Sequence, residues 1–245
     1  MDEKNYKILI ISPTYNEKEN IHPLVSGIFS QNIDSQILFV DDNSQDGTRS
    51  EILKMQKEWP GRVHLLPRPA KLGLGSAYVE GFLWGLEKRF DYFVEMDADL
   101  SHAPQYLKAF MKQLPAYQVV TGSRYIEGGG TENWSPLRKF ISKAGSWYAR
   151  TILGLKVHDF TGGYNLWHRS VFEKIDPKSL KSDGYVFQIE LKYRALLSGF
   201  SLKEVPILFC DRRAGHSKMS SRIILEAVYK VIFLRLFRSK YVSTP

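Results

Sequence analysis

Short apolar runs recur along the first half of the chain, and each ends in a polar or turn-forming residue. The runs lie at residues 7–13, 36–42, 62–68, 91–99 and 117–123, with room for a helix between one and the next. This alternation predicts a parallel sheet, and nearly continuous apolar runs are typical of strands that helices cover on both faces. Ligands bind such open sheets beyond the carboxyl ends of the strands. The polar residues that follow each run are therefore the candidate site.

The pattern changes after about residue 125. A glycine-rich loop from Glu127 to Gly130 precedes a predicted helix from Pro136 to Leu153, and a turn-rich stretch at 159–165 precedes a second predicted helix from about Gly184 to Ser198. We interpret this half as an acceptor-facing extension of one α/β catalytic domain, residues 1–220.

The last apolar stretch, from Ser221 to Phe237, contains four charged residues. A membrane-spanning helix needs about 20 predominantly apolar residues, so this stretch is too charged and marginally too short to span. We predict that residues 221–245 form an amphipathic, membrane-interfacial helix and tail, with basic residues at the end that suit anionic lipid. The alternative is a helix that packs on the core or on a partner subunit.

Composition narrows the class of protein. The chain has 245 residues, is 43% hydrophobic and carries one cysteine, Cys210. One cysteine excludes an intramolecular disulfide framework and a cysteine-rich zinc site, which favours a reducing compartment, and the polar, acidic first residues predict no export. The net charge of +8 and pI near 9.4 require an anionic partner: nucleic acid, anionic lipid or a phosphorylated small substrate. Because zinc-finger ligands, an RNP-type aromatic signature and long basic runs are absent from the sequence, we predict no nucleic-acid partner.

The strongest local signal is the pair Asp97 and Asp99 at the end of the fourth apolar run. In an extended chain, residues two apart point to the same side. Two such carboxylates suit a hard cation such as Mg²⁺ or Mn²⁺, with phosphate oxygens completing the coordination shell. The alternative is a solvated turn with helix-capping acids. Glu95 has the same parity, and we interpret it as sheet-edge chemistry.

Two other strand ends carry candidate ligand-binding groups. Pro13, Tyr15 and Glu17 follow the first run, and Asp41 and Asp42 end the second. Each segment also has an ordinary explanation as a strand-to-helix turn. Three acidic or aromatic ends on one sheet would converge on a crevice that could hold a base, a ribose diol and a metal-bound diphosphate.

The segment GLGSAYVEG could suggest a dinucleotide-binding fingerprint, because Gly73 and Gly75 precede a predicted helix. Tyr78 stands where that fingerprint requires its third glycine, so a nicotinamide enzyme is disfavoured. Lys71 and the two glycines then mark either a close approach to the donor pocket or a helix start.

Several motifs in chain order resemble glycosyltransferase family 2, and within it the dolichol-phosphate mannosyltransferases. They are PTYNE, VDDNSQDGT, GLGSAY, MDADLSH, GSRY, DFTGGYN and GYVFQIE, between about residues 6 and 220. The resemblance implies a GT-A fold, a Rossmann-like and mostly parallel central sheet flanked by helices. It further implies GDP-mannose as donor, Mg²⁺ or Mn²⁺ as cofactor, a dolichyl or polyprenyl phosphate as acceptor, and work at the cytoplasmic face of a membrane. Many relatives append transmembrane helices, so a separate membrane subunit is a further candidate partner.

The same resemblance assigns roles to individual residues. It implies that the nucleotide sugar is held by Pro13, Tyr15, Glu17, Val40, Asp42, Asp97, Ala98, Asp99, Arg213 and Lys218, and the metal by Asp97, Asp99 and Ser101. Ser101 stands where some relatives carry Gln, and Arg212 is an alternative to Arg213. The implied acceptor-phosphate residues are Arg124, Arg138 and Ser142, with Asp159 and Gln188 near the sugar and acceptor. Arg124 joins Asp97 and Asp99 as a predicted catalytic residue.

The predicted reaction needs no strong protein base, because the second pKa of a phosphate monoester is about 6 and the acceptor is already ionised. Direct displacement would invert an α-linked donor into a β-linked lipid phosphomannose. Two alternatives stay open: a polyprenyl-phosphate glucosyltransferase that uses UDP-glucose, and a non-catalytic basic module that binds nucleotides or nucleic acid.

Overall fold

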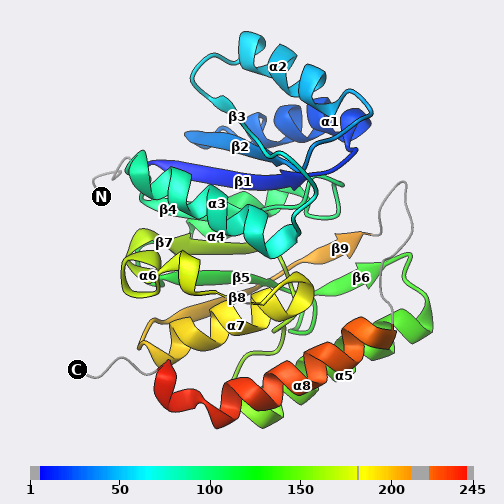
Figure 1. Cartoon of the computed structure of the whole chain (residues 1–245), viewed down its shortest axis with the longest axis vertical. Helices are drawn as coiled ribbons and strands as arrows, with labels where there is room; N and C mark the ends of the chain where they lie inside the picture. Colours follow the sequence, from blue (N-terminus) through cyan, green and yellow to red (C-terminus); the bar gives the residue numbers. More distant parts are fainter. Residues whose placement is uncertain (1–5, 181, 211–220, 242–245) are drawn as a thin grey trace.

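The computed structural model describes residues 6–180, 182–210 and 221–241, and a seven-stranded sheet forms its centre (Figure 1). The strands of this sheet are β1 (Ile8–Thr14), β2 (Ser35–Asp41), β3 (Val63–Pro67), β4 (Tyr92–Glu95), β5 (Val119–Ser123), β7 (Asn165–His168) and β8 (Leu202–Pro206). Their order is β3-β2-β1-β4-β7-β5-β8, and a separate parallel pair joins β6 (Gly130–Glu132) to β9 (Leu208–Cys210). All five predicted strands are confirmed.

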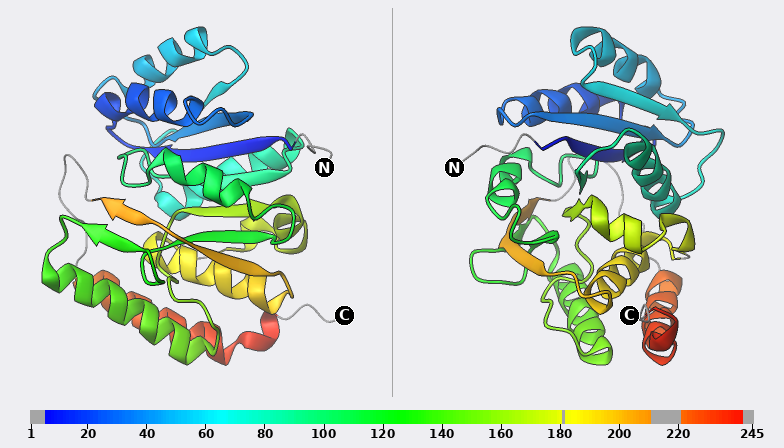
Figure 2. Two further views of the ribbon diagram at one scale, coloured as in Figure 1. Left: turned by 180° about the vertical axis from the view of Figure 1, so that it is seen from behind. Right: turned by 90° about the vertical axis from the view of Figure 1, so that its left-hand side faces the viewer.

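Helices cover both faces of the sheet (Figure 2). They are α1 (Lys18–Phe29), α2 (Thr48–Glu58), α3 (Leu74–Glu87), α4 (Leu107–Met111), α5 (Pro136–Leu153), α6 (Arg169–Lys174), α7 (Gly184–Leu197) and α8 (Ser221–Leu236), with short 3₁₀ turns at Pro104–Tyr106, Pro177–Ser179 and Arg238–Lys240. Helices α1, α2 and α4 lie on one face, and α3, α6 and α7 lie on the other.

Alternation along β1 explains why two cores form. Ile8 and Ile10 belong to the core under α1, α2 and α4, whereas Leu9 and Ile11 belong to the core under α3, α6 and α7. Because successive strand residues point to opposite faces, an apolar residue at every position supplies both cores at once. The nearly continuous apolar runs therefore predicted the double covering correctly.

Strand β7 departs from the parallel pattern. It runs antiparallel to both of its neighbours, β4 and β5, and so separates two groups of parallel strands. The turn-rich pattern at residues 159–165 does not indicate this strand, which begins at Asn165. The sequence pattern also does not indicate β6, β8 and β9; β6 begins at Gly130, within the predicted glycine-rich loop.

Helix α5 has the predicted bounds, and its ends explain them. The hydroxyl of Ser135 accepts a hydrogen bond from the backbone N–H of Arg138, Pro136 occupies the first turn, and Gly154 takes a left-handed φ of 70° at the end. Serine at the N-cap and proline in the first turn are favoured at the amino end of a helix, and glycine is favoured just after its carboxyl end.

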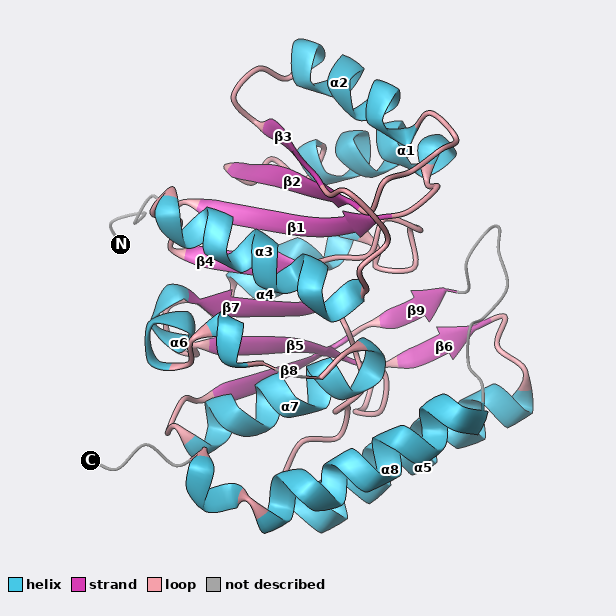
Figure 3. Ribbon diagram, viewed as in Figure 1, coloured by secondary structure: helices cyan, strands magenta, loops and turns pink. Residues whose placement is uncertain are grey.

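Helix α8 lies beside α5 and α7 (Figure 3). Its side chains Val231 and Leu234 pack with Ala149 and Leu153 of α5 and with Tyr193 of α7. Within the described part of the chain, no helix combines the length and apolar character that crossing a membrane requires. The proposed division at residue 220 between a catalytic domain and an interfacial segment stays a prediction.

Candidate active site

The three predicted donor segments meet at one edge of the sheet, because β2, β1 and β4 are neighbours in space. Pro13 lies opposite Val40 in the β1–β2 register, and the backbone N–H of Asp42 donates to Thr14 at 2.9 Å. On the other side of β1, the N–H of Met96 donates to Ile11 at 3.1 Å. The carboxyl ends of the three strands therefore converge as predicted.

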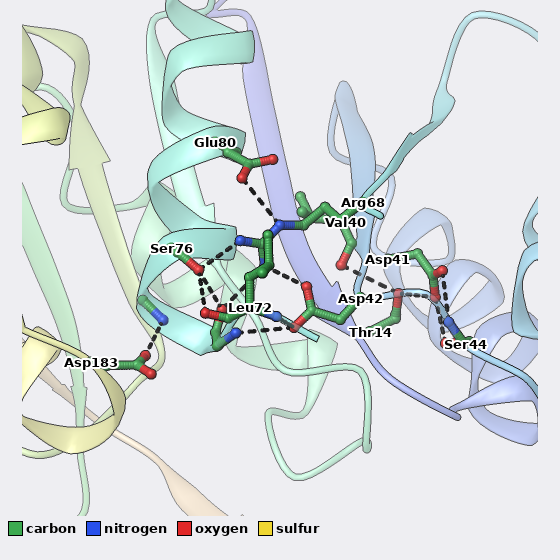
Figure 4. A network of polar contacts seen from close by, with 12 residues as sticks. Thr14, Val40, Asp41, Asp42, Ser44, Arg68, Leu72, Ser76, Glu80 and Asp183 are labelled. Carbon is green, nitrogen blue, oxygen red and sulfur yellow. Dashed lines mark hydrogen bonds and ion pairs between the residues drawn. The ribbon is translucent and has the colours of Figure 1, made fainter. Parts of the chain in front are cut away.

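Asp42 stands at the centre of a polar network beyond β2 (Figure 4). Its carboxylate forms an ion pair with Arg68 and accepts the backbone N–H groups of Leu72 at 3.2 Å and Gly73 at 3.3 Å. Arg68 is 2% exposed and also donates to Ser76 at 2.6 Å. Asp42 thus fixes the loop before α3. The sequence pattern did not single out Arg68, although its position as the last residue of the third apolar run was an available signal.

The two glycines lie at the start of α3, Gly73 as its N-cap and Gly75 in its first turn. Gly73 has a φ of +105°, and the N–H of Gly75 donates to the Asp183 carboxylate at 2.7 Å, across to the segment that opens α7. A hollow of about 280 Å³ lies here, lined in part by Leu72, Ser76 and Asp183. A side chain on Gly75 would come within 2.9 Å of a backbone carbonyl oxygen, so glycine is required by close packing.

Tyr15 offers a partly exposed ring beyond β1. Its exposed fraction is 37%, and the ammonium of Lys71 lies 3.8 Å from the ring centroid. Glu17 is half-buried; its backbone N–H donates to Thr48 at 2.9 Å, and its carboxylate accepts from Asn20 at 2.7 Å. The segment that follows β1 is therefore fastened to the start of α2, and the nucleoside-binding roles of Tyr15 and Glu17 stay predictions.

The aspartate pair follows β4, and Ala98 between the two acids is buried. Asp97 is 28% exposed at its side chain and accepts a hydrogen bond from the hydroxyl of Tyr78 at 3.2 Å. Burial, followed by the charge of Asp97, raises the pKa of Tyr78 well above its usual value, so this hydroxyl stays a donor. Asp99 is buried and accepts both the backbone N–H and the hydroxyl of Ser101, at 3.1 and 2.6 Å.

His102 fastens the aspartate turn to the core. Its Nδ1 accepts the backbone N–H of Asp97 at 3.0 Å, and its ring stacks on Tyr164 with centroids 4.9 Å apart. The conformation of the turn is therefore fixed by buried groups.

The donor set fits a cation that shares its shell with a phosphate. Among the described residues, no cluster of three or more His, Cys, Asp or Glu side chains could enclose a metal ion. Asp97, Asp99 and the Ser101 hydroxyl offer oxygen ligands from one strand end, which suits Mg²⁺ or Mn²⁺ when a diphosphate supplies the others. The metal roles of these three residues stay predictions.

The predicted acceptor residues lie near one another on the other half of the sheet. Arg124, 7% exposed, makes a bidentate ion pair with fully buried Asp159, with both nitrogen-to-oxygen distances 2.7 Å. Burial alone would raise the pKa of Asp159, but the Arg124 charge outweighs it, and the pKa is lowered. Asp159 therefore holds the guanidinium in place, a role that the sequence did not reveal.

Aromatic rings connect Arg124 with the other two acceptor candidates. The Arg138 guanidinium lies 4.0 Å from the centroid of the Trp134 ring, and that of Arg124 lies 5.4 Å from the same ring. The hydroxyl of Tyr125, next to Arg124, donates to Ser142 at 2.6 Å. Arg138, Ser142 and Arg124 are thus brought together, although their binding of a phosphate stays a prediction.

The structure corrects the interpretation of Glu95 as a residue at the edge of the sheet. It is fully buried in the middle of the sheet, between β1 and β7. Its carboxylate accepts from Asn165 at 2.7 Å, Trp167 at 3.0 Å and Gln188 at 3.0 Å. Burial raises the pKa of Glu95 to about 7, against these hydrogen bonds, which lower it.

Gln188 is an inner member of this network. Its amide oxygen accepts from Asn165 at 2.8 Å while its amide nitrogen donates to Glu95. The side chain is 3% exposed and joins α7 to β4 and β7. Its predicted place near the sugar stays a prediction, and in the structure both ends of its amide serve the packing of α7.

A buried lysine on α7 supports the turn that carries Asp159. The ammonium of Lys192 donates to the backbone carbonyls of Asp159 at 3.0 Å, Phe160 at 3.4 Å and Gly162 at 2.8 Å. Burial lowers the pKa of Lys192 to about 8, although the charges of Asp159 and Glu95 act to raise it. Lys192 and Glu95 therefore hold parts of the candidate site in place, and their hydrogen-bond partners are distant in sequence.

The predicted diphosphate-binding segment lies outside the described residues. It includes Arg212, Arg213 and Lys218. The donor roles of these three residues therefore rest on the resemblance alone.

Comparison with known proteins identifies the family. Residues 9–176, well over half of the chain, match the sequence model of glycosyl transferase family 2. The chain therefore belongs to this family.

Two curated relatives and one solved structure extend the comparison. The chain is 45% identical over 226 residues to a polyprenol monophosphomannose synthase from Mycolicibacterium smegmatis, covering 92% of this chain and 85% of that protein. It is 43% identical over 226 residues to an undecaprenyl-phosphate mannosyltransferase from Micrococcus luteus, covering 92% of each. The structure of a mannosyltransferase from Pyrobaculum calidifontis, in complex with GDP-Man and Mn²⁺, has a TM-score of 0.64 at 18% identity, covering 96% of this chain and 65% of that one. The structural likeness confirms the expected GT-A architecture.

Proposed function

We propose that this member of glycosyl transferase family 2 transfers mannose from GDP-mannose to a polyprenyl phosphate at a membrane surface. The observation that carries the proposal is the arrangement of the site. An aspartate pair follows β4, an arginine pair lies beyond β5, and aromatic rings packed edge-to-face connect the two (His102, Phe209 and Trp134). The two curated relatives, whose names specify mannose and polyprenyl phosphates, support the same reaction.

The donor half suits a nucleoside diphosphate sugar. Tyr15 offers a ring face, Asp42 follows the neighbouring strand, and Asp97 with Asp99 would hold a Mg²⁺ or Mn²⁺ ion against the diphosphate. Such an ion supplies positive charge where the leaving diphosphate becomes more negative. The related fold from Pyrobaculum calidifontis was solved with GDP-Man and Mn²⁺, which supports this choice of donor and cofactor.

The acceptor half suits a phosphate monoester. A planar, permanently charged guanidinium binds phosphate oxygens well, and Arg124 and Arg138 supply two of them. In the transfer, one phosphate oxygen forms the new bond to the anomeric carbon of mannose. The bond from that carbon to GDP breaks, and GDP leaves with the electron pair. Positioning and electrostatics therefore account for catalysis, and direct displacement inverts the configuration.

The membrane-facing surface is formed by the paired helices α5 and α8. On α5, Leu137, Phe140 and Trp147 are 68, 71 and 62% exposed. On α8 the exposed apolar side chains are Val228, Tyr229, Ile232, Phe233 and Leu236. Exposed lysines and arginines accompany them, including Lys139, Lys143 and Arg235. Apolar side chains among basic ones suit the interface of an anionic bilayer, at its cytoplasmic face.

The test is transfer of labelled mannose into an organic-extractable product. Purified protein, GDP-mannose, a polyprenyl phosphate and Mn²⁺ should give lipid-phase label that EDTA abolishes. Asp99→Ala should abolish it as well. Asp34→Ala is the matched control, because Asp34 is an exposed aspartate before β2, and it should retain full activity.

Two outcomes would change the proposal. Transfer from UDP-glucose but not from GDP-mannose would overturn the donor and leave the acceptor and mechanism in place. No transfer from either donor to any polyprenyl phosphate would overturn the transferase function of the isolated chain and favour a role that requires a membrane subunit.

A further inference from the structure

The indole of Trp134 carries a buried hydrogen-bond donor that has no acceptor in the described part of the chain. Trp134 is 8% exposed, and its Nε1 is one of three buried side-chain polar atoms without a partner among the described residues. Leaving a buried donor unsatisfied destabilises a folded protein. Such groups are rare in folded proteins, and a group of this kind at a site points to an acceptor that a ligand supplies.

The surroundings of Trp134 favour an anionic ligand. The guanidinium of Arg138 lies over its ring at 4.0 Å, and that of Arg124 lies 5.4 Å from the ring centroid. Trp134 directly precedes Ser135, the N-cap of α5, and the amino end of a helix carries partial positive charge. Two cations, a helix amino terminus and an unused neutral donor therefore meet at one place.

Trp134 also lies on the side of the site that faces the donor. Its ring packs edge-on against Phe209, with centroids 5.3 Å apart, and Phe209 packs in the same way against His102 at 5.5 Å. His102 accepts the backbone N–H of Asp97. A phosphate at Trp134 would therefore lie two aromatic rings from the aspartate pair.

We propose that the indole N–H of Trp134 donates a hydrogen bond to the phosphate of the lipid acceptor, between Arg124 and Arg138. This inference rests on the proposed function, whose acceptor it makes specific. A phosphate monoester offers three terminal oxygens, so it can accept from two guanidinium groups and one neutral donor together. The indole N–H would then orient the phosphate, and the two arginines would neutralise it.

The experiment measures binding of geranyl phosphate, a short polyprenyl phosphate, by calorimetry. Trp134→Phe removes the N–H but keeps an aromatic ring for Arg138. It should weaken geranyl phosphate binding by about 10- to 100-fold, the effect of losing a hydrogen bond to a charged group. Affinity for GDP-mannose with Mn²⁺ should change by less than about twofold, and binding of uncharged geraniol should not change.

Two further variants separate this role from a packing role. Trp84→Phe is the matched control, because Trp84 lies near the far end of α3 beside Phe90, and it should bind like the wild type. If Trp134→Phe does not fold, β-(3-benzothienyl)alanine at position 134 replaces the N–H by sulfur and preserves the shape of the ring. That protein should show the same selective loss.

The outcomes are distinct. Equal geranyl phosphate affinity in the wild type and the variants, a parallel loss of donor affinity, or no binding to the wild type would each overturn the inference. If the wild type transfers no mannose but its geranyl phosphate binding depends on Trp134, the proposed function fails, and Trp134 is a lipid-phosphate ligand that is not part of an acceptor site.

Discussion

The buried pair of Arg124 and Asp159 should dominate the stability of the acceptor half. The Asp159 carboxylate is fully buried and accepts from the Arg124 backbone at 3.0 Å, from the Arg124 guanidinium twice at 2.7 Å, and from the Gly162 N–H at 2.9 Å. Asp159→Asn keeps the shape of the side chain but leaves the guanidinium as an uncompensated buried charge. Breaking a buried pair in this way costs about 3–5 kcal/mol, so the melting midpoint should fall by about 10 °C.

The assay is urea unfolding of the purified variants. Arg124→Met combined with Asp159→Leu removes both charges, so it should be clearly more stable than Asp159→Asn alone. Glu173→Gln is the control, because Glu173 forms an exposed pair with Arg169 at 2.7 Å on α6. It should cost less than about 1 kcal/mol. A loss below about 1 kcal/mol for Asp159→Asn, or a double variant no more stable than it, would refute the reasoning.

Three further predictions address the metal site, the membrane surface and pH. Asp97→Asn should reduce mannose transfer by at least about 100-fold. Its urea unfolding should stay close to that of the wild type, because the side chain of Asp97 is 28% exposed. A loss of stability large enough to explain the lost transfer would contradict this prediction. Replacing Leu137, Phe140 and Trp147 together by Ser should lower the affinity for anionic vesicles, measured by sedimentation, by about 100-fold, because each exposed apolar side chain contributes about 1 kcal/mol to binding. Unchanged sedimentation would refute the proposed membrane-facing surface. The folded pKa of Asp159 lies below the ordinary 3.8, so its contribution to the free energy of unfolding is present above pH 3.8 and is lost as pH falls through the lower folded value. The stability difference between the wild type and Asp159→Asn should therefore shrink below about pH 4, and a constant difference in acid urea titrations would contradict this.

Local patterns predicted the donor half well because its information is local. Each strand of β1 to β4 is a continuous apolar run that ends in a charged or turn-forming residue, and neighbouring parallel strands bring their ends together. Helix α5 was predicted to the residue because Pro136 and Gly154 mark its ends. Pro13 lies opposite Val40 because β1 pairs with β2, and the turn of Asp97 and Asp99 follows the end of β4 because β4 pairs with β1 on the other side.

The acceptor half could not be predicted in the same way, because its partners are distant in sequence. Glu95 meets Asn165 and Gln188, which lie 70 and 93 residues further along the chain. Strand β7 has the sequence NLWH, in which only two of four residues are apolar, so no apolar run marks it. Nothing local distinguishes a buried glutamate from an exposed one, so the interpretation of Glu95 was wrong.

The antiparallel strand β7 explains why charges are buried between the two halves of the site. The chain enters β7 through the turn at 159–162, whose carbonyls face α7, and Lys192 satisfies three of them. A buried ammonium needs compensation, and the carboxylates of Asp159 and Glu95 provide it. Asp159 in turn holds Arg124. Four buried ionisable side chains, those of Glu95, Lys192, Asp159 and Arg124, therefore gather in this part of the core. Because Asp159 pairs with Arg124 within the protein, we expect the guanidinium to need little reordering when a phosphate binds, which lowers the cost of binding.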